Sequence, residues 1–127
     1  MTIHYFTVEE ANDLLPLIEP LVGDLLARRA RVVYQRQALA PLLDDLRVDI
    51  GGTAVSELTV EFEKIELLMR EIQAYGCVVK SINVGLIDFW SKVDGDDVFL
   101  CWRYGEDRVD YYHPLHEGYN GRLRIKK

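Results

Sequence analysis

The strongest constraint on the fold is a change of hydrophobic period at Gly76. Before this residue, apolar side chains recur at alternating spacings of three and four, which is the period of an amphipathic helix. After it, β-branched and aromatic residues come in short runs separated by turn residues, which is the pattern of strands. The chain therefore predicts an α+β fold in which helices precede a sheet.

The first helix is predicted to begin at Thr7, because Thr7 and Glu10 have the spacing of a capping box. Pro16 and Pro20 lie in its early turns, where each removes an N–H group, so we expect a break or bend near residues 15–20 and a separate short helix over 8–15. The apolar stripe that follows, with Arg29 and Arg36 in its register, comprises Ile18, Val22, Leu25, Val32, Leu39, Leu43 and Leu46.

A second helical stripe follows the Gly51-Gly52 pair and ends at Gly76, which is placed to act as a C-cap. Its members are Leu58, Phe62, Ile65, Met69 and Ile72. Two such helices joined by a short glycine loop predict a long antiparallel helical hairpin over about residues 7–76. The interhelical ion pairs predicted by this pairing are Arg36 with Glu63 or Glu66, and Arg29 with Glu71.

Residues 77–127 predict a small four-stranded antiparallel sheet, from the runs CVVKSI, GLIDFW, DVFLCWRY and RVDYYH. Asp94-Gly95-Asp96-Asp97 is expected to form one hairpin turn, and Glu106-Asp107 the tip of the next. Keeping apolar residues on one face aligns Phe89 with Leu100 and Ile87 with Trp102, and so places Asp88 near Cys101. The Glu106-Asp107 tip aligns Trp102 with Tyr111, Cys101 with Tyr112 and Arg103 with Asp110. The apolar face of the sheet is expected to receive the helices.

Length and charge limit the classes of function. A chain of 127 residues predicts a single domain over 1–127, and a net charge of −6 argues against nucleic-acid binding. The start of the chain lacks the pattern of a signal peptide, and no apolar run is long enough to span a membrane, so we expect a cytoplasmic protein. Cys77 and Cys101 are too few for a disulfide framework and are expected to be reduced packing residues.

Polar side chains gather on the predicted sheet and could bind a small polar or anionic ligand. The candidate ligand-binding residues are Asp88, Arg103, Asp110, Tyr112, His113 and Arg122. In that role Arg103 and Arg122 would hold an anionic group, while Tyr112 and His113 would orient it. The alternative is structural, because a cross-strand Arg103–Asp110 pair on a solvated face is a common feature of sheets.

Metal binding is the alternative chemistry. His113, His116 and Glu117 offer nitrogen and oxygen ligands to a divalent metal, with Asp88 or Asp110 to complete the set. Pro114 argues against a regular helix that would carry both histidines on one face.

Nucleophilic catalysis is a further alternative. Cys101 could pair with His113 or His116, although its place between two large apolar residues suits packing better.

Several motifs together resemble the bacterial family catalogued as domain of unknown function 2203. They are FTVEEAN with LLP, EIQAYGCVVKSINVGLIDF, LCWRYGE, YYH and EGYNGR, and they span essentially the whole chain. The resemblance implies a helical hairpin followed by a small sheet, without an established activity or cofactor. The residues that it singles out are Asp88, Trp102, Arg103, Gly105, Glu106, His113, Gly118, Gly121 and Arg122. Trp90-Ser91-Lys92 stands where a shorter or proline-bearing turn is expected.

The sequence favours a noncatalytic module, since no complete set of catalytic residues can be assembled from it. We expect it to self-associate as a homodimer through its helical surface, because a two-helix hairpin cannot bury both faces of long helices. We further expect it to bind a protein partner or a small polar ligand, without a cofactor. The first alternative is a small metal-dependent hydrolytic enzyme that uses His113, His116 and Glu117, and the second is a structural subunit of a larger complex.

Overall fold

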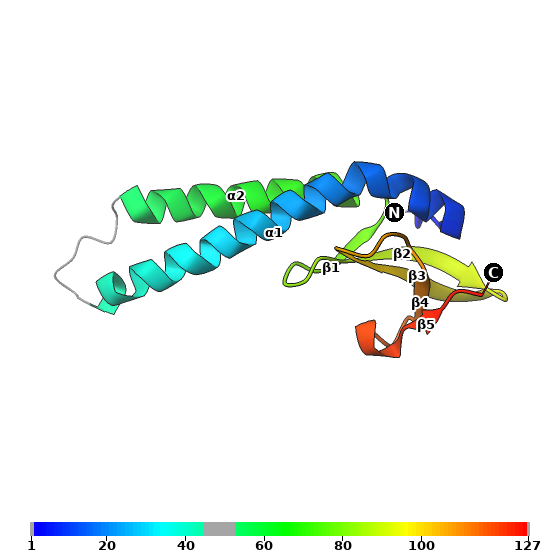
Figure 1. The fold of residues 1–127 in the computed structure, drawn as a ribbon. Coiled ribbons are helices and arrows are strands. Elements are labelled where there is room, and N and C mark those ends of the chain that lie inside the picture. Colours follow the sequence, from blue (N-terminus) through cyan, green and yellow to red (C-terminus); the bar gives the residue numbers. More distant parts are fainter. Residues whose placement is uncertain (1, 45–52, 127) are drawn as a thin grey trace.

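A computed structural model describes residues 2–44 and 53–126, in which two helices precede an antiparallel sheet (Figure 1). The helices are α1 (Val8–Asp44) and α2 (Thr53–Gln73). The strands are β1 (Val78–Ser81), β2 (Leu86–Val93), β3 (Asp96–Arg103), β4 (Tyr111–Pro114) and β5 (Leu123–Arg124), with a 3-10 turn at Tyr119–Gly121 before β5. The α+β prediction is confirmed, and the predicted glycine loop lies outside the described residues.

The sheet has five strands rather than the predicted four. The additional strand, β5, is two residues long and pairs with β4, where Arg124 lies opposite Tyr111. A strand this short cannot show an alternating pattern, because two residues contain a single step of the period. The sequence runs therefore could not reveal it.

Helix α1 begins with the predicted capping box. The backbone N–H of Glu10 donates to Thr7 Oγ1 at 3.1 Å, and the backbone N–H of Thr7 donates to Glu10 Oε1 at 3.0 Å. Each bond satisfies a backbone N–H that has no partner within the helix. At the other end of the hairpin, Gly76 has φ +99°, so its role as a C-cap of α2 is also supported.

The predicted separate helix over residues 8–15 is wrong, because α1 is continuous through both prolines. Pro16 and Pro20 are one turn apart and both are exposed, so the carbonyls that they leave without donors are close to water. The helix accommodates the two missing bonds by a gradual bend, and its first turns curve over the end of the sheet (Figure 1).

The helices lie antiparallel along a shared apolar seam. On α1 the predicted stripe is buried at Ile18, Val22, Leu25 and Val32. On α2 the buried residues are Ile65, Leu68 and Ile72, whereas Phe62 is 49% exposed, so the predicted second stripe was partly wrong. The buried face of α2 is centred on Ile65 and Leu68. Phe62 therefore lies beside the interface between the two helices and not within it.

The ion pairs between the helices differ from those predicted. Glu61 accepts from Arg28 at 3.2 Å and lies 3.6 Å from Arg31. In antiparallel helices this register moves Glu63 and Glu66 away from Arg36. Arg29, predicted to pair with Glu71, donates instead to Asn83 Oδ1 at 2.9 Å and so ties α1 to the turn between β1 and β2.

The register of β2 against β3 is as predicted, with Ile87 opposite Trp102 and Asp88 opposite Cys101. The two-residue turn between these strands has φ +52° at Asp94 and +85° at Gly95. Both angles are positive, as a type I′ hairpin turn requires. Alternating side chains and a two-residue turn leave one sensible pairing, so this register was predictable.

The register of β3 against β4 was predicted one residue out. Cys101 lies opposite Tyr111, rather than Tyr112, and Leu100 lies opposite Tyr112. The connection is a longer loop rather than a tight tip, because Glu106 folds back: its carboxylate accepts from the backbone N–H of Arg103 at 2.7 Å. A shift of one residue exchanges the faces, so Tyr111 shares a face with Cys101, and Tyr112 points to the helix side.

The helix-facing side of the sheet joins the main core through Ile87, Phe89, Leu100 and Trp102. The N-terminal segment lies along β2, where the Phe6 N–H donates to the Trp90 carbonyl at 2.7 Å and Ser91 Oγ donates to the Phe6 carbonyl at 2.6 Å. Within residues 2–44 and 53–126, neither helix has the length and apolar character needed to cross a membrane.

Candidate metal centre

Three buried side chains with metal-binding atoms meet on the sheet face that points away from the helices. Asp88, Cys101 and His113 come from the adjacent strands β2, β3 and β4, and their exposed fractions are 0%, 1% and 1%. The paired strands place Asp88 opposite Cys101, and His113 opposite Phe99 on the same face. One oxygen, one sulfur and one nitrogen atom from this group lie within 4.8 Å of one another.

The hydrogen bonds of His113 define which of its nitrogens faces the cluster. Nδ1 lies 2.9 Å from the Pro114 carbonyl, and Nε2 lies 3.1 Å from Asp88 Oδ2. A carbonyl oxygen can only accept, so Nδ1 carries a hydrogen and Nε2 points at the carboxyl group, with one proton shared between Nε2 and Oδ2. The other oxygen, Asp88 Oδ1, is buried and has no hydrogen-bond partner.

Burial dominates the electrostatics of the cluster. It raises the pKa of Asp88, and the neighbouring His113 opposes this rise. Burial also raises the pKa of the Cys101 thiol to about 12, with a further contribution from the charge of Asp88. With such a pKa and with both nitrogens of His113 engaged, the thiol is not an activated nucleophile. The Cys101–histidine pairing considered from the sequence is therefore not assembled here.

Arg122 borders the cluster but is already neutralised. Its Nη2 atom donates to both oxygens of Glu106, at 2.8 and 2.7 Å. The guanidinium lies over the rings of Tyr111 and Tyr119, at 4.0 and 4.7 Å from their centroids. Stacking and a two-oxygen ion pair hold this side chain firmly. Arg122 therefore links the loop after β3 to the segment before β5.

The structure brings some of the predicted site residues together and separates others. Asp88 and His113 meet. Arg103 is exposed beside Tyr119, and Asp110 is 3.1 Å from Arg124, so the predicted Arg103–Asp110 pair is not formed. Tyr112 lies on the opposite face from the cluster.

His116 and Glu117 are exposed in the turn after β4, and in the described part of the chain neither joins the donor group around His113. Sequence reasoning considered Cys101 as a nucleophile and missed it as a ligand. The signal was nevertheless present, because the predicted β2–β3 register already placed it beside Asp88.

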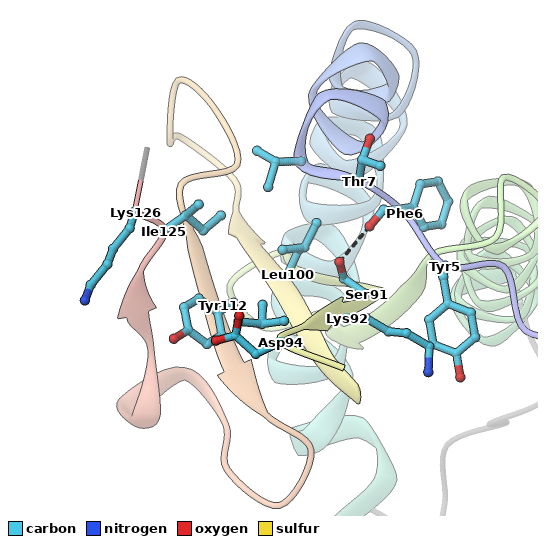
Figure 2. A pocket seen from close by; sticks show the side chains of 12 residues that line it. Tyr5, Phe6, Thr7, Ser91, Lys92, Asp94, Leu100, Tyr112, Ile125 and Lys126 are labelled. Carbon is cyan, nitrogen blue, oxygen red and sulfur yellow. Dashed lines mark hydrogen bonds between the residues drawn. The ribbon is translucent and has the colours of Figure 1, made fainter. Parts of the chain in front are cut away.

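A cavity of about 670 Å³ opens at the other end of the sheet, on the helix-facing side (Figure 2). Leu100 and Tyr112 line it from β3 and β4, Ile125 lines it from the C-terminal segment, and Phe6 borders it with its ring turned away. The polar residues that line it are Tyr5, Thr7, Ser91, Lys92, Asp94 and Lys126. Lys92 is held at the rim by Asp97, at 2.9 Å, and lies 4.7 Å from the centre of the Tyr5 ring.

The fold and the cluster define a small α+β protein with a helical hairpin on one face of its sheet and a buried carboxyl–thiol–imidazole group on the other. The chain belongs to the family described as Uncharacterized conserved protein (DUF2203), whose pattern matches residues 4–125. Neither the curated proteins nor the solved structures gave a match.

Proposed function

We propose that the protein binds one divalent transition-metal ion, with Zn²⁺ the best match, through Asp88, Cys101 and His113. The observation that carries this proposal is the buried and unpartnered Oδ1 atom of Asp88 beside a thiol and an imidazole. A buried carboxylate oxygen without a partner costs free energy, and a bound cation would remove that cost.

The donor set and its spacing suit zinc. Bonds of about 2.0–2.3 Å to a tetrahedral ion place ligand atoms roughly 3.3–3.6 Å apart. Here Nε2 and Oδ2 are 3.1 Å apart, and the three donor atoms lie within 4.8 Å, so small side-chain adjustments are enough. The bond from Nδ1 to the Pro114 carbonyl is also typical of a zinc-bound histidine, since it fixes the tautomer that presents Nε2.

The charges balance as well. A carboxylate, a thiolate and a neutral imidazole together carry two negative charges, which match a divalent ion. Metal binding would displace the shared proton and the thiol proton, because ligands bind zinc in their deprotonated forms. Lys80 near Asp88 and Arg122 near Cys101 are cations that oppose this, and the bonds of Arg122 to Glu106 reduce its effect on the site.

The role that the geometry favours is stabilising rather than catalytic. Three protein ligands leave the fourth position of a tetrahedral zinc ion to water, which is the ligand count of catalytic sites. All three proposed ligands are, however, at most 1% exposed, so this position is shielded from a substrate. A metal held in this position would tie together β2, β3 and β4. The alternative enzyme, a hydrolase using His113, His116 and Glu117, keeps only His113 in this cluster.

Cobalt substitution tests the proposal. Untagged protein prepared without chelator is titrated with Co²⁺, and we expect one equivalent to give a near-ultraviolet sulfur-to-cobalt charge-transfer band that Zn²⁺ abolishes. Cys101→Ser should lose this band. Cys77→Ser, which removes the other buried thiol, should keep it, and so should His116→Ala. Absence of the band at one equivalent, or its persistence in Cys101→Ser, would overturn the metal assignment.

We also propose that the cavity in Figure 2 holds a small amphipathic molecule, with its apolar body over Leu100 and Tyr112 and an anionic group near Lys126. Its volume is in the range of roughly 300–1,000 Å³ that is typical of ligand sites.

Binding of the anionic dye 8-anilinonaphthalene-1-sulfonate tests this second proposal. Ile125→Trp should fill the cavity and weaken dye binding at least fivefold, whereas Leu115→Trp, at an exposed position, should not. Equal binding by both variants would rule out the cavity as the dye site.

A further inference from the structure

The two helices continue well past the sheet as a projecting arm (Figure 1). We define the arm as residues 27–38 of α1 and 56–67 of α2. Among these residues Val32 and Ile65 alone are buried, and the rest are half-buried or exposed. A pair of helices without a third layer can bury a single seam, so most of the surface of the arm faces solvent.

The outer surface of the arm carries several large apolar side chains. Its large exposed apolar side chains are Val33 (39%), Tyr34 (73%), Val60 (45%), Phe62 (49%) and Leu67 (54%). Single exposed apolar residues are common, but five of them on one projecting element indicate a surface that is covered by a partner.

The charges of the arm indicate what that partner is. Residues 27–38 of α1 carry four arginines and no acidic residue, whereas residues 56–67 of α2 carry four glutamates and one lysine. Glu61 is shared by Arg28 and Arg31 within the chain, but Arg36 on α1 and Glu57 and Glu63 on α2 are exposed. One helix is thus basic and the other acidic.

We infer that the arm is a dimerisation surface whose partner is a second copy of this chain. In a twofold arrangement, α1 of each copy lies along α2 of the other, so the basic helix meets the acidic helix twice. This self-complementarity is what an isologous interface requires, and charged residues beside an apolar seam set the choice of partner in helical bundles. The assembly is a four-helix bundle from which two sheets project. It does not depend on the metal centre.

Sedimentation velocity on the full chain tests the inference. Wild-type protein should sediment with a mass about twice the 14.7 kDa of one chain. An acidic variant, Arg36→Glu with Gln37→Glu, gives the exposed outer end of α1 the same negative sign as Glu57 and Glu63 of α2. A basic variant, Glu57→Lys with Glu63→Lys, gives these exposed positions of α2 the same positive sign as Arg36. Each variant alone should be monomeric at concentrations where the wild type is dimeric. An equimolar mixture of the two should recover the dimer, because positions 36 and 37 of each copy then face positions 57 and 63 of the other with opposite charge.

The controls separate association from folding. Both variants should keep the wild-type circular dichroism spectrum, and Asp107→Lys, a charge reversal at an exposed site remote from the arm, should remain dimeric. A wild-type monomer over the whole concentration range would overturn the inference. Homodimers of either variant, or a mixture that stays monomeric, would show that α1 does not lie along the partner's α2.

Discussion

Asp88 shows how much depends on single residues in this protein. It is fully buried, it shares a proton with His113, and one of its oxygens lacks a partner. A helix cap such as Glu10 is the opposite case, since its carboxylate is exposed, accepts from the Thr7 N–H and lies 3.9 Å from His4 Nε2. Asp88 should therefore affect the protein through metal binding, and Glu10 through the dependence of its stability on pH.

Glu10 should make the stability of the folded protein depend on pH. The backbone and side-chain bonds with Thr7 lower the pKa of Glu10 below its ordinary value. A carboxyl whose pKa is lower in the folded state contributes stability above its unfolded pKa and loses it as the pH falls through the folded pKa. Glu10→Gln should therefore be less stable than wild type at neutral pH, and the difference should vanish well below about pH 4. Urea unfolding at several pH values measures this, and a pH-independent difference would contradict it.

At the scale of elements, the sequence predicts structure wherever the signal is local. The capping box and the β2–β3 hairpin depend on residues within a few positions of one another, and both were predicted. The β3–β4 register depends on a carboxylate, Glu106, that folds back onto its own strand, and no pattern of apolar residues records that bond. The error mattered for the site, because the correct register is what places His113 on the same face as Asp88.

The close approach of two elements at Gly85 yields a prediction. Gly85 has φ +73°, and a Cβ atom there would lie 2.8 Å from Tyr104 Cβ and 3.1 Å from Val22. Gly85→Ala should therefore lower the free energy of unfolding by more than the roughly 1 kcal/mol expected from backbone strain alone. Gly95→Ala is the matched control, since φ is +85° but nothing lies within 4 Å of the added atom. Urea unfolding should find Gly85→Ala the more destabilised of the two, and equal losses would mean that the packing relaxes freely.

At the scale of the whole molecule, the side chain of Asn12 joins α1 to the loop between β3 and β4. Asn12 Oδ1 accepts from the Val109 N–H at 2.7 Å, and its Nδ2 donates to the Val109 carbonyl at 3.2 Å. Sequence reasoning could not find this contact, because it links residues 97 positions apart and neither belongs to a recognisable motif.

Removal of this link should destabilise the protein measurably. Asn12→Ala leaves both backbone groups of the buried Val109 without their partner, at a cost of about 1–3 kcal/mol. Asn120→Ala, at an exposed position, should change stability by less than about 0.5 kcal/mol. Chemical denaturation at a fixed protein concentration compares the two variants, and equal stabilities would show that Asn12 does not join helix and sheet.

The order of strands in the sheet follows their order in the chain, β1 to β5. Each strand pairing therefore closes only a short loop, which has a small entropic cost and forms early in folding. The contact between Asn12 and Val109 closes the longest loop described above. We expect the meander to form first and α1 to dock last, so that Asn12→Ala speeds unfolding while leaving the rate of folding nearly unchanged.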